Sequence, residues 1–206
     1  MKQLFMMVFV ILIAITTYAQ KKKYIGLTFF NTQTDMPFGK FAGLFKDALH
    51  PGLEFRFGKN ISTKKNHDWF REWRLAYFYH RYVQSGIPLY FDMGYRRHFI
   101  RHFEAETSIG AGVMRSIPGT QVFNQNDVGE WHALKLKGRW QLIATYEIGI
   151  GYTLNPQASR PLQIFSVYQQ RIQFPFVNSY IPLLPYNSFM IGVSKTIGNK
   201  SKNKLK

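Results

Sequence analysis

The sequence predicts an all-β fold: an eight-stranded antiparallel up-and-down transmembrane barrel with a polar, side-chain-filled lumen. Three observations predict it. Eight segments alternate between apolar and polar residues, the polar face carries charges of both signs among small residues, and the links between segments alternate in length. A soluble sandwich would share the first feature, because its strands also alternate. The second and third features favour a barrel in a membrane.

The alternating segments lie along the whole chain after its first twenty or so residues. They cover roughly 23–31, 50–59, 70–82, 87–98, 102–114, 139–154, 161–172 and 186–197. Several are longer than the average strand of about 5–6 residues. They match instead the roughly 9–11 residues with which a tilted strand crosses a bilayer.

The polar faces of these segments do not resemble solvent faces. In F-E-A-E-T-S-I-G-A-G-V-M (103–114), Glu104 and Glu106 alternate with apolar residues and are followed by Ser108 and glycines. A narrow eight-stranded lumen is filled by side chains, and buried charges in it must be paired. We expect Glu104, Glu106 and Glu147 to pair across the barrel with arginines. The predicted lumen charge network is Glu54, Arg56, Arg74, Asp92, Glu104, Glu106, Arg139 and Glu147.

The links between segments alternate in length. Those after the first, fifth and seventh segments are long, at 32–49, 115–138 and 173–185, whereas those after the second, fourth and sixth are polar and mostly shorter. The third link, V-Q-S-G, is the exception. Outer-membrane barrels have short periplasmic turns, longer external loops and an even number of strands. The alternation therefore predicts that both termini lie on the periplasmic side.

The N-terminus resembles a secretory signal. Lys2 precedes an apolar run from Leu4 to Ile15, and T-Y-A offers small residues for cleavage before Gln20. The run is too short for a membrane helix of roughly 20 residues. We therefore expect a signal peptide at 1–19, a barrel domain at 20–198 and a basic, disordered tail at 199–206.

The composition limits the classes of partner. The chain has no cysteine, so disulfide and thiol chemistry are excluded. Its net charge is +16. In a secreted protein this balance favours anionic membrane surfaces or partners over nucleic acid. Aromatic residues make up 17% of the chain, which suits girdles at two membrane interfaces.

Three stretches resemble a known group of proteins. H-P-G-L-E-F-R-F-G, Y-F-Y-H-R-Y-V-Q and Y-I-P-L-L-P-Y, together with the signal ending T-Y-A-Q, are similar to small outer-membrane β-barrel proteins of the Bacteroidota. The resemblance spans the chain after the signal. It implies an outer-membrane barrel and no agreed activity.

The sequence gives little support for a catalytic site or a metal site. Some small outer-membrane barrels modify lipid A with a Ser, a His and an acid; His80 and Ser85 are weak candidates, with Asp92 or Glu104 as the acid. Their spacing does not match the closer His-x-Ser arrangement of the deacylases, which favours a structural His80. The cluster of Arg96, Arg97, His98, Arg101 and His102 at an inner turn suits lipid phosphates or solvent better than a metal. We expect no metal and no cofactor.

Two long links have an unusual apolar content. Residues 38–49 predict a short amphipathic helix at the membrane surface, and 173–185 combines apolar residues with proline. Such loops either dock on a partner or fold over the barrel mouth. The residues expected to face a partner or the membrane surface are Phe38, Phe41, Phe45, Phe176, Tyr180 and Leu183.

These observations predict a non-enzymatic outer-membrane barrel that is structural or an accessory subunit of a larger outer-membrane assembly. Outer-membrane lipids are its expected partners, with another outer-membrane protein as a second partner. One alternative is an outer-membrane enzyme that modifies lipid A or phospholipid. The other is a soluble periplasmic lipocalin-like barrel, whose interior would be apolar.

Overall fold

The structure is a computed structural model of the chain. It describes residues 22–36, 39, 42–81, 83–99, 102–119, 123–126, 129–133, 138–176 and 182–197. The predicted signal peptide at 1–19 and the predicted tail at 199–206 lie outside the described residues. Among the described residues, no helix has the length and apolar content that crossing a membrane requires.

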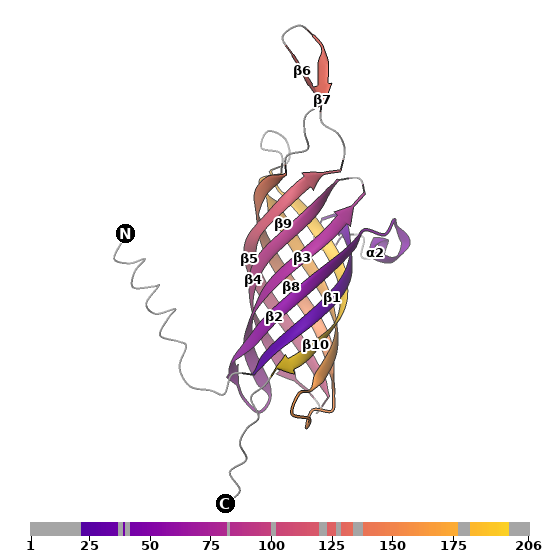
Figure 1. The fold of residues 1–206 in the computed structure, drawn as a ribbon. Helices are drawn as coiled ribbons and strands as arrows, with labels where there is room; N and C mark the ends of the chain where they lie inside the picture. The colour runs from indigo at the N-terminus through magenta and orange to yellow at the C-terminus, as the bar shows by residue number, and fades with distance from the viewer. Residues whose placement is uncertain are drawn as a thin grey trace, which may run out of the picture.

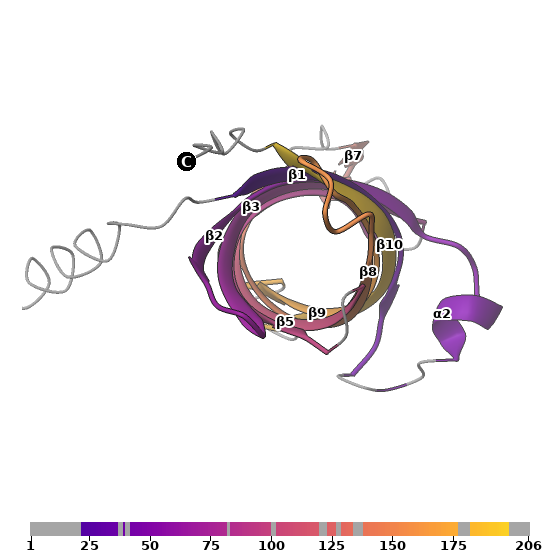
Figure 2. The same ribbon diagram turned by 90° about the horizontal axis from the view of Figure 1, so that it is seen from below.

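Eight long strands form one closed antiparallel barrel (Figures 1 and 2). Their order around the ring is β1-β10-β9-β8-β5-β4-β3-β2, so the first and last strands pair. This is the predicted fold class, including the number of strands and the up-and-down connection. The barrel strands are β1 (Lys23–Thr34), β2 (Pro51–Thr63), β3 (His67–His80), β4 (Gln84–His98), β5 (Phe103–Pro118), β8 (Arg139–Leu154), β9 (Leu162–Phe174) and β10 (Leu184–Ile197).

Seven of the eight barrel strands extend beyond their alternating segments at one of their ends, and β8 matches its segment. Strand β3, for instance, begins at His67, where the alternation was recognisable only from residue 70. The predicted link 115–138 also holds a hairpin of β6 (Phe123–Gln125) and β7 (Trp131–Ala133) that the sequence did not reveal. In Figure 1 this hairpin projects beyond the barrel.

The two ends of the barrel differ in their connections. We name the end where β1 begins and β10 finishes the inner end, and the opposite end the outer end. The inner connections are short, at 64–66, 99–102 and 155–161. The outer ones include the long segments 35–50 and 119–138, and the short link 81–83 is again the exception. The parity predicted from the sequence is therefore present.

The outer wall of the barrel is apolar on all eight strands. Leu27, Leu53 and Trp73 are each about half exposed, and so are equivalent residues around the ring. Every strand contributes at least one such side chain: Leu27, Phe29, Leu53, Phe55, Trp73, Leu75, Leu89, Met93, Ile109, Val113, Leu142, Ile148, Ile150, Ile164, Ile172, Ile191 and Val193. A soluble monomer rarely exposes contiguous apolar patches of more than a few hundred Å².

The lumen holds the opposite set of side chains. Its buried residues include carboxylates, arginines, glutamines and aromatic rings, with Arg56, Arg74 and Arg171 no more than 1% exposed. Glycines make room for the rings: a Cβ at Gly94 would lie 2.3 Å from the Phe70 ring, and one at Gly58 would lie 2.2 Å from the Tyr24 ring. The lipocalin-like alternative requires an apolar interior. The buried charges contradict that alternative.

A short helix, α2 (Gly43–Lys46), lies beside the barrel wall and not over its mouth (Figure 2). It confirms, in shorter form, the helix expected within 38–49. Asn31 donates to the Leu44 carbonyl oxygen at 2.6 Å and fixes the helix to β1. Leu44 is buried, whereas Phe45 is 60% exposed and packs edge-on against Phe189 of β10 at 5.0 Å.

Candidate functional site

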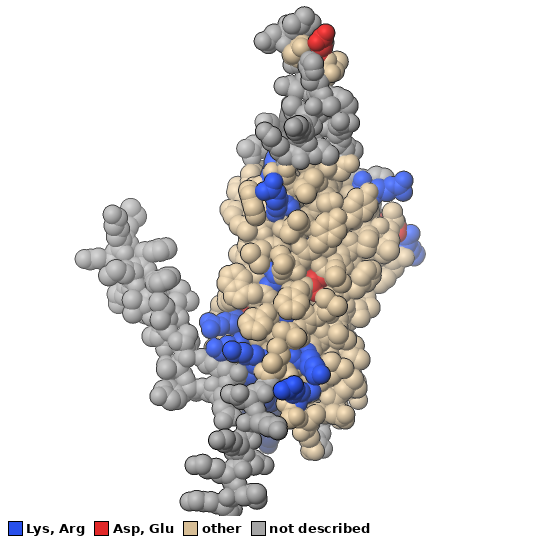
Figure 3. Space-filling model, in the orientation of Figure 1, with Lys and Arg blue, Asp and Glu red and all other residues tan. Residues whose placement is uncertain are grey.

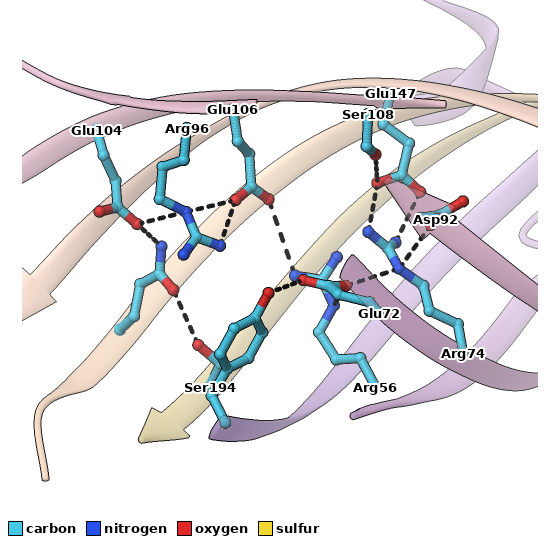
Figure 4. Close-up of polar contacts among 12 residues, drawn as sticks. Arg56, Glu72, Arg74, Asp92, Arg96, Glu104, Glu106, Ser108, Glu147 and Ser194 are labelled. Carbon is cyan, nitrogen blue, oxygen red and sulfur yellow. Dashed lines mark hydrogen bonds and ion pairs between the residues drawn. The ribbon is translucent and has the colours of Figure 1, made fainter. Parts of the chain in front are cut away.

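Arg74 on β3 lies among a cluster of buried carboxylates in the lumen, and Figure 4 shows Glu72, Asp92 and Glu147 beside it. Four carboxylates surround its guanidinium, and none of these side chains is more than 3% exposed. They come from four strands, because alternate residues of every strand point inward. The nitrogen–oxygen distances are 2.7 Å to Glu147, 2.8 Å to Asp92, 2.9 Å to Glu72 and 3.3 Å to Glu54.

Arg56 on β2 continues the cluster toward the inner end. It lies 3.4 Å from Glu72 and 3.8 Å from Glu106, so it joins the central carboxylates to β5. Its guanidinium carbon lies 4.2 Å from the centre of the Phe165 ring on β9. A cation over an aromatic face is stabilised further where water is excluded.

Arg96 on β4 and His98 form the innermost layer of the cluster. Arg96 lies 2.8 Å from Glu106 and 3.3 Å from Glu104. His98 lies 3.1 Å from both Asp68 and Glu104, so it bridges β3 and β5. Every carboxylate of this layer therefore has a nitrogen partner.

Neutral side chains complete the network. Tyr24 donates to Glu72 at 2.6 Å, and Tyr90 donates to Glu54. Gln169 on β9 donates to Glu147 at 2.5 Å and accepts from Arg171 at 2.7 Å. Such a network is rigid when its groups are satisfied, because the low local dielectric strengthens each bond.

The outer half of the lumen is built from amides and rings instead of carboxylates. Gln84 donates to Gln173 at 2.5 Å and to the Tyr186 hydroxyl at 2.8 Å. Gln173 in turn donates to Gln141 at 2.6 Å. Phe30 and Phe78 lie beneath this layer and are fully buried, together with Arg171.

Two histidines stack at the outer mouth. The rings of His50 and His80 are 3.7 Å apart and nearly parallel, at 8°. His50 precedes β2, and its backbone holds it in place through bonds to Asn31 and Thr32. Burial lowers the pKa of His50 below its usual value of 6.5, because the charged ring would lose its hydration.

The structure brings together most of the predicted lumen charge network. Arg139 is the exception: it is exposed at the outer end, as the first residue of β8, and forms no ion pair with a described residue. Its expected pairing with lumenal glutamates is wrong because it lies above their layer. The residues found inward and buried are Glu54, Arg56, Arg74, Asp92, Glu104, Glu106 and Glu147.

The predicted lumen charge network lacks four buried charges of the lumen: Asp68, Glu72, Arg96 and Arg171. Glu72 lies two residues before Arg74 on β3, so both side chains face inward. Arg96 was assigned to the basic cluster at the inner turn, although it lies on β4. Arg171 lies in a polar run, Y-Q-Q-R, where alternation gives no contrast. Parity relative to a known inward neighbour, Arg74 or Asp92, is the signal that would have identified Glu72 and Arg96.

His80 and Ser85 do not form a catalytic pair. His80 points into the lumen and is 3% exposed. Ser85 lies between Gln84 and Gly86, both of which face inward, so its side chain points to the outer wall. The two side chains are therefore on opposite faces of the sheet, and the acids proposed beside them are held by Arg74 and Arg96.

The basic cluster at the inner turn is divided between two faces. Arg96 and His98 face the lumen and pair with carboxylates, whereas Arg97 faces outward and is exposed. Arg101 lies outside the described residues. No group of three or more His, Asp or Glu side chains in the described part of the chain is arranged to hold a metal ion.

The predicted partner-facing loops are described only in part. Phe38, Phe41 and Tyr180 lie outside the described residues. Leu183 is 50% exposed at the outer end. Phe176 donates its backbone N–H to the Pro182 carbonyl oxygen at 3.0 Å, which draws the ends of the last loop together.

No protein-family model matches the sequence, and no curated protein sequence matches it. Solved barrel structures resemble it in architecture. Neisserial surface protein A matches with a TM-score of 0.49 and 8% identity over 85% of this chain and 96% of that one. Ail of Yersinia pestis, solved with the heparin analogue sucrose octasulfate, gives 0.43 and 13% over 85% and 97%. The outer membrane protein OprG of Pseudomonas aeruginosa gives 0.37 and 9% over 90% and 99%. This likeness concerns the fold alone, and the Bacteroidota resemblance stays a prediction.

Proposed function

We propose that the protein is a sealed outer-membrane barrel that acts without catalysis, as an anchor or accessory subunit of a larger outer-membrane assembly. The observation that carries this proposal is the distribution of side chains. Apolar residues are exposed on all eight strands, while every carboxylate of these strands is buried inside, together with Arg56, Arg74, Arg96 and Arg171. Lipid is the solvent in which such a wall is stable.

The arrangement of the lumen supports a sealed barrel over an open pore. Arg74 is fully buried, and its bond to Glu147 joins β3 to β8 across the barrel. The bond between Arg56 and Glu106 joins β2 to β5 in the same way. Bulky side chains that meet across the axis leave no continuous water path at this level.

The four tryptophans of the chain offer a direct test of the membrane position. Trp73 lies in the middle of β3, Trp69 and Trp140 lie toward the inner and outer ends, and Trp131 is on the projecting β7. All four are exposed. Variants that keep one tryptophan each, with Phe at the other three positions, are folded into vesicles of brominated phospholipid.

We expect quenching to be strongest for Trp73, intermediate for Trp69 and Trp140, and absent for Trp131. Trp131 is the matched control because it is equally exposed but lies beyond the barrel. Equal quenching at all four positions, or none at Trp73, would contradict the membrane position. A mature protein that remains in the aqueous periplasm without detergent would contradict it too.

The accessory role concerns the loops at the outer end. Exposed apolar side chains there, such as Phe45 and Leu183, resemble the anchors of protein interfaces. Photo-crosslinkers at Phe41 and Tyr180 in intact cells test this role. Capture of a second outer-membrane protein is the expected result, and crosslinks confined to this chain would leave a free-standing anchor.

A further inference from the structure

The inner mouth of the barrel contains a cavity of about 270 Å³. Residues from all eight barrel strands line it, so it lies on the barrel axis and not on the lipid-facing wall. It is slightly smaller than the roughly 300–1,000 Å³ of typical small-molecule sites. A ligand here would enter along the axis, from the aqueous side.

Each carboxylate on the floor of the cavity already has a nitrogen partner. Asp68 and Glu104 are its two carboxylates. His98 lies 3.1 Å from each of them, and Arg96 lies 3.3 Å from Glu104. The two floor carboxylates are therefore bound before any lysine of the rim is counted.

Three lysines at the rim have no such partner. Lys22, Lys64 and Lys65 line the cavity and are exposed. None of them forms an ion pair with another described residue. A hollow with walls of low dielectric and charges of one sign concentrates the field and attracts counter-ions.

The surroundings of the cavity carry the same sign. Lys and Arg gather over the inner end (Figure 3), and the described part of this end exposes no Asp or Glu. Two groups can be separated by direction. Arg97 and Lys195 are exposed on the outward face of their strands, whereas the three rim lysines line the cavity from one side, before β1 and in the turn between β2 and β3.

We propose that the inner mouth binds an acidic peptide segment that carries closely spaced carboxylates. The rim lysines supply the charge for these carboxylates. Hydroxyl and amide groups of the lining offer hydrogen bonds to a peptide backbone, and they belong to Asn60, Thr63, Thr153, Ser194 and Thr196. This inference rests on the outer-membrane position proposed above and on the orientation predicted from the link lengths, in which the inner end faces the periplasm.

The test uses the full barrel in an uncharged detergent and a fluorescein-labelled triglutamate peptide, with binding followed by anisotropy. We expect saturable binding that weakens as salt is raised, because the contacts are electrostatic. The double variant Lys64→Gln/Lys65→Gln should bind at least roughly tenfold more weakly, and adding Lys22→Gln should weaken binding further. A labelled trilysine peptide should not bind.

The matched control removes two charges from the same end without touching the cavity. Arg97→Gln/Lys195→Gln should bind triglutamate within about twofold of the unaltered protein. An equal loss in both double variants would overturn the proposal, because the field would then be diffuse. The proposal is also overturned if the barrel does not bind triglutamate but binds phosphatidylglycerol vesicles through Lys64 and Lys65. The peptide-binding experiment is done in detergent, and the tryptophan-quenching experiment is done in lipid vesicles. Either experiment can therefore fail without the other failing.

Discussion

The inner and outer halves of the lumen are both buried, but different chemistry fills them. In the inner half, Arg56 and Arg74 bind carboxylates from strands across the barrel, and Arg96 binds Glu106 on the neighbouring strand β5. In the outer half, glutamines bond to one another, and Phe30 and Phe78 pack beneath them. The inner half therefore depends on charge pairing, and the outer half depends on amide bonds and packing.

The comparison teaches that one closed wall can enclose two kinds of core. The ladder of backbone bonds fixes which side chains point inward, whatever their type. Ion pairs are costly to break once water is excluded, because a single charge remains behind. Neutral amides lose less when one partner is removed. Substitutions in the two halves should therefore differ in size.

The largest effect is expected for Arg74→Met. The variant leaves four buried carboxylates without the guanidinium that lies within 3.3 Å of each of them. We expect the free energy of unfolding to fall by about 3–5 kcal/mol. Urea unfolding in detergent micelles, followed by tryptophan fluorescence, measures this change.

The control for this prediction is Arg139→Met, because Arg139 is exposed and outside the ion-pair network. Its effect should stay within about 0.5 kcal/mol. Equal stability of the two variants would mean that water reaches Arg74, and the contrast between the two halves would disappear.

The sequence predicted the wall and the inner half well. Alternation alone placed Glu54, Glu106 and Glu147 inside, since a side-chain period of two leaves only two choices. It could not give depth along the axis, which depends on the tilt and stagger of the strands. Arg139 was therefore assigned to the wrong layer, and Arg96 was separated from the carboxylates that it binds.

The outer half was not predictable in the same way. Glutamines, tyrosines and histidines occur on both faces of strands. Their positions in the sequence therefore do not distinguish the lumen face from the lipid face. Nothing in the sequence marks His50 as the stacking partner of His80, because one lies in a connection and the other ends β3. Only the closed ring brings these segments together.

An intermediate effect is expected for Gln84→Met in the outer half. The change removes the donor that Gln173 and the Tyr186 hydroxyl share. Because the abandoned acceptors are buried but neutral, the loss should be about 1–3 kcal/mol. Ser85→Ala is the control, since this side chain faces outward; its effect should stay within about 0.5 kcal/mol. A Gln84→Met protein with unchanged stability would show that the outer half is wet.

The smallest effect is expected from acid, at the stacked histidines. Burial holds the pKa of His50 below the 6.5 of an unfolded chain. Its contribution to stability is therefore complete above about pH 6.5 and is lost as the pH falls toward the pKa of the folded protein, because only the unfolded chain binds the proton in that range. The loss is at most about 1.4 kcal/mol per pH unit.

Comparison with His50→Phe isolates this contribution. Phe keeps an aromatic ring beside His80 but cannot be protonated, so the variant should lose less stability between pH 6.5 and pH 4.5. Groups away from this stack titrate alike in both proteins, so the difference between the two urea-unfolding profiles reports His50 together with its stacked neighbour His80. Parallel profiles over this range would mean that the His50 ring is hydrated, and that the outer mouth is less tightly closed than the stacking distance of 3.7 Å indicates.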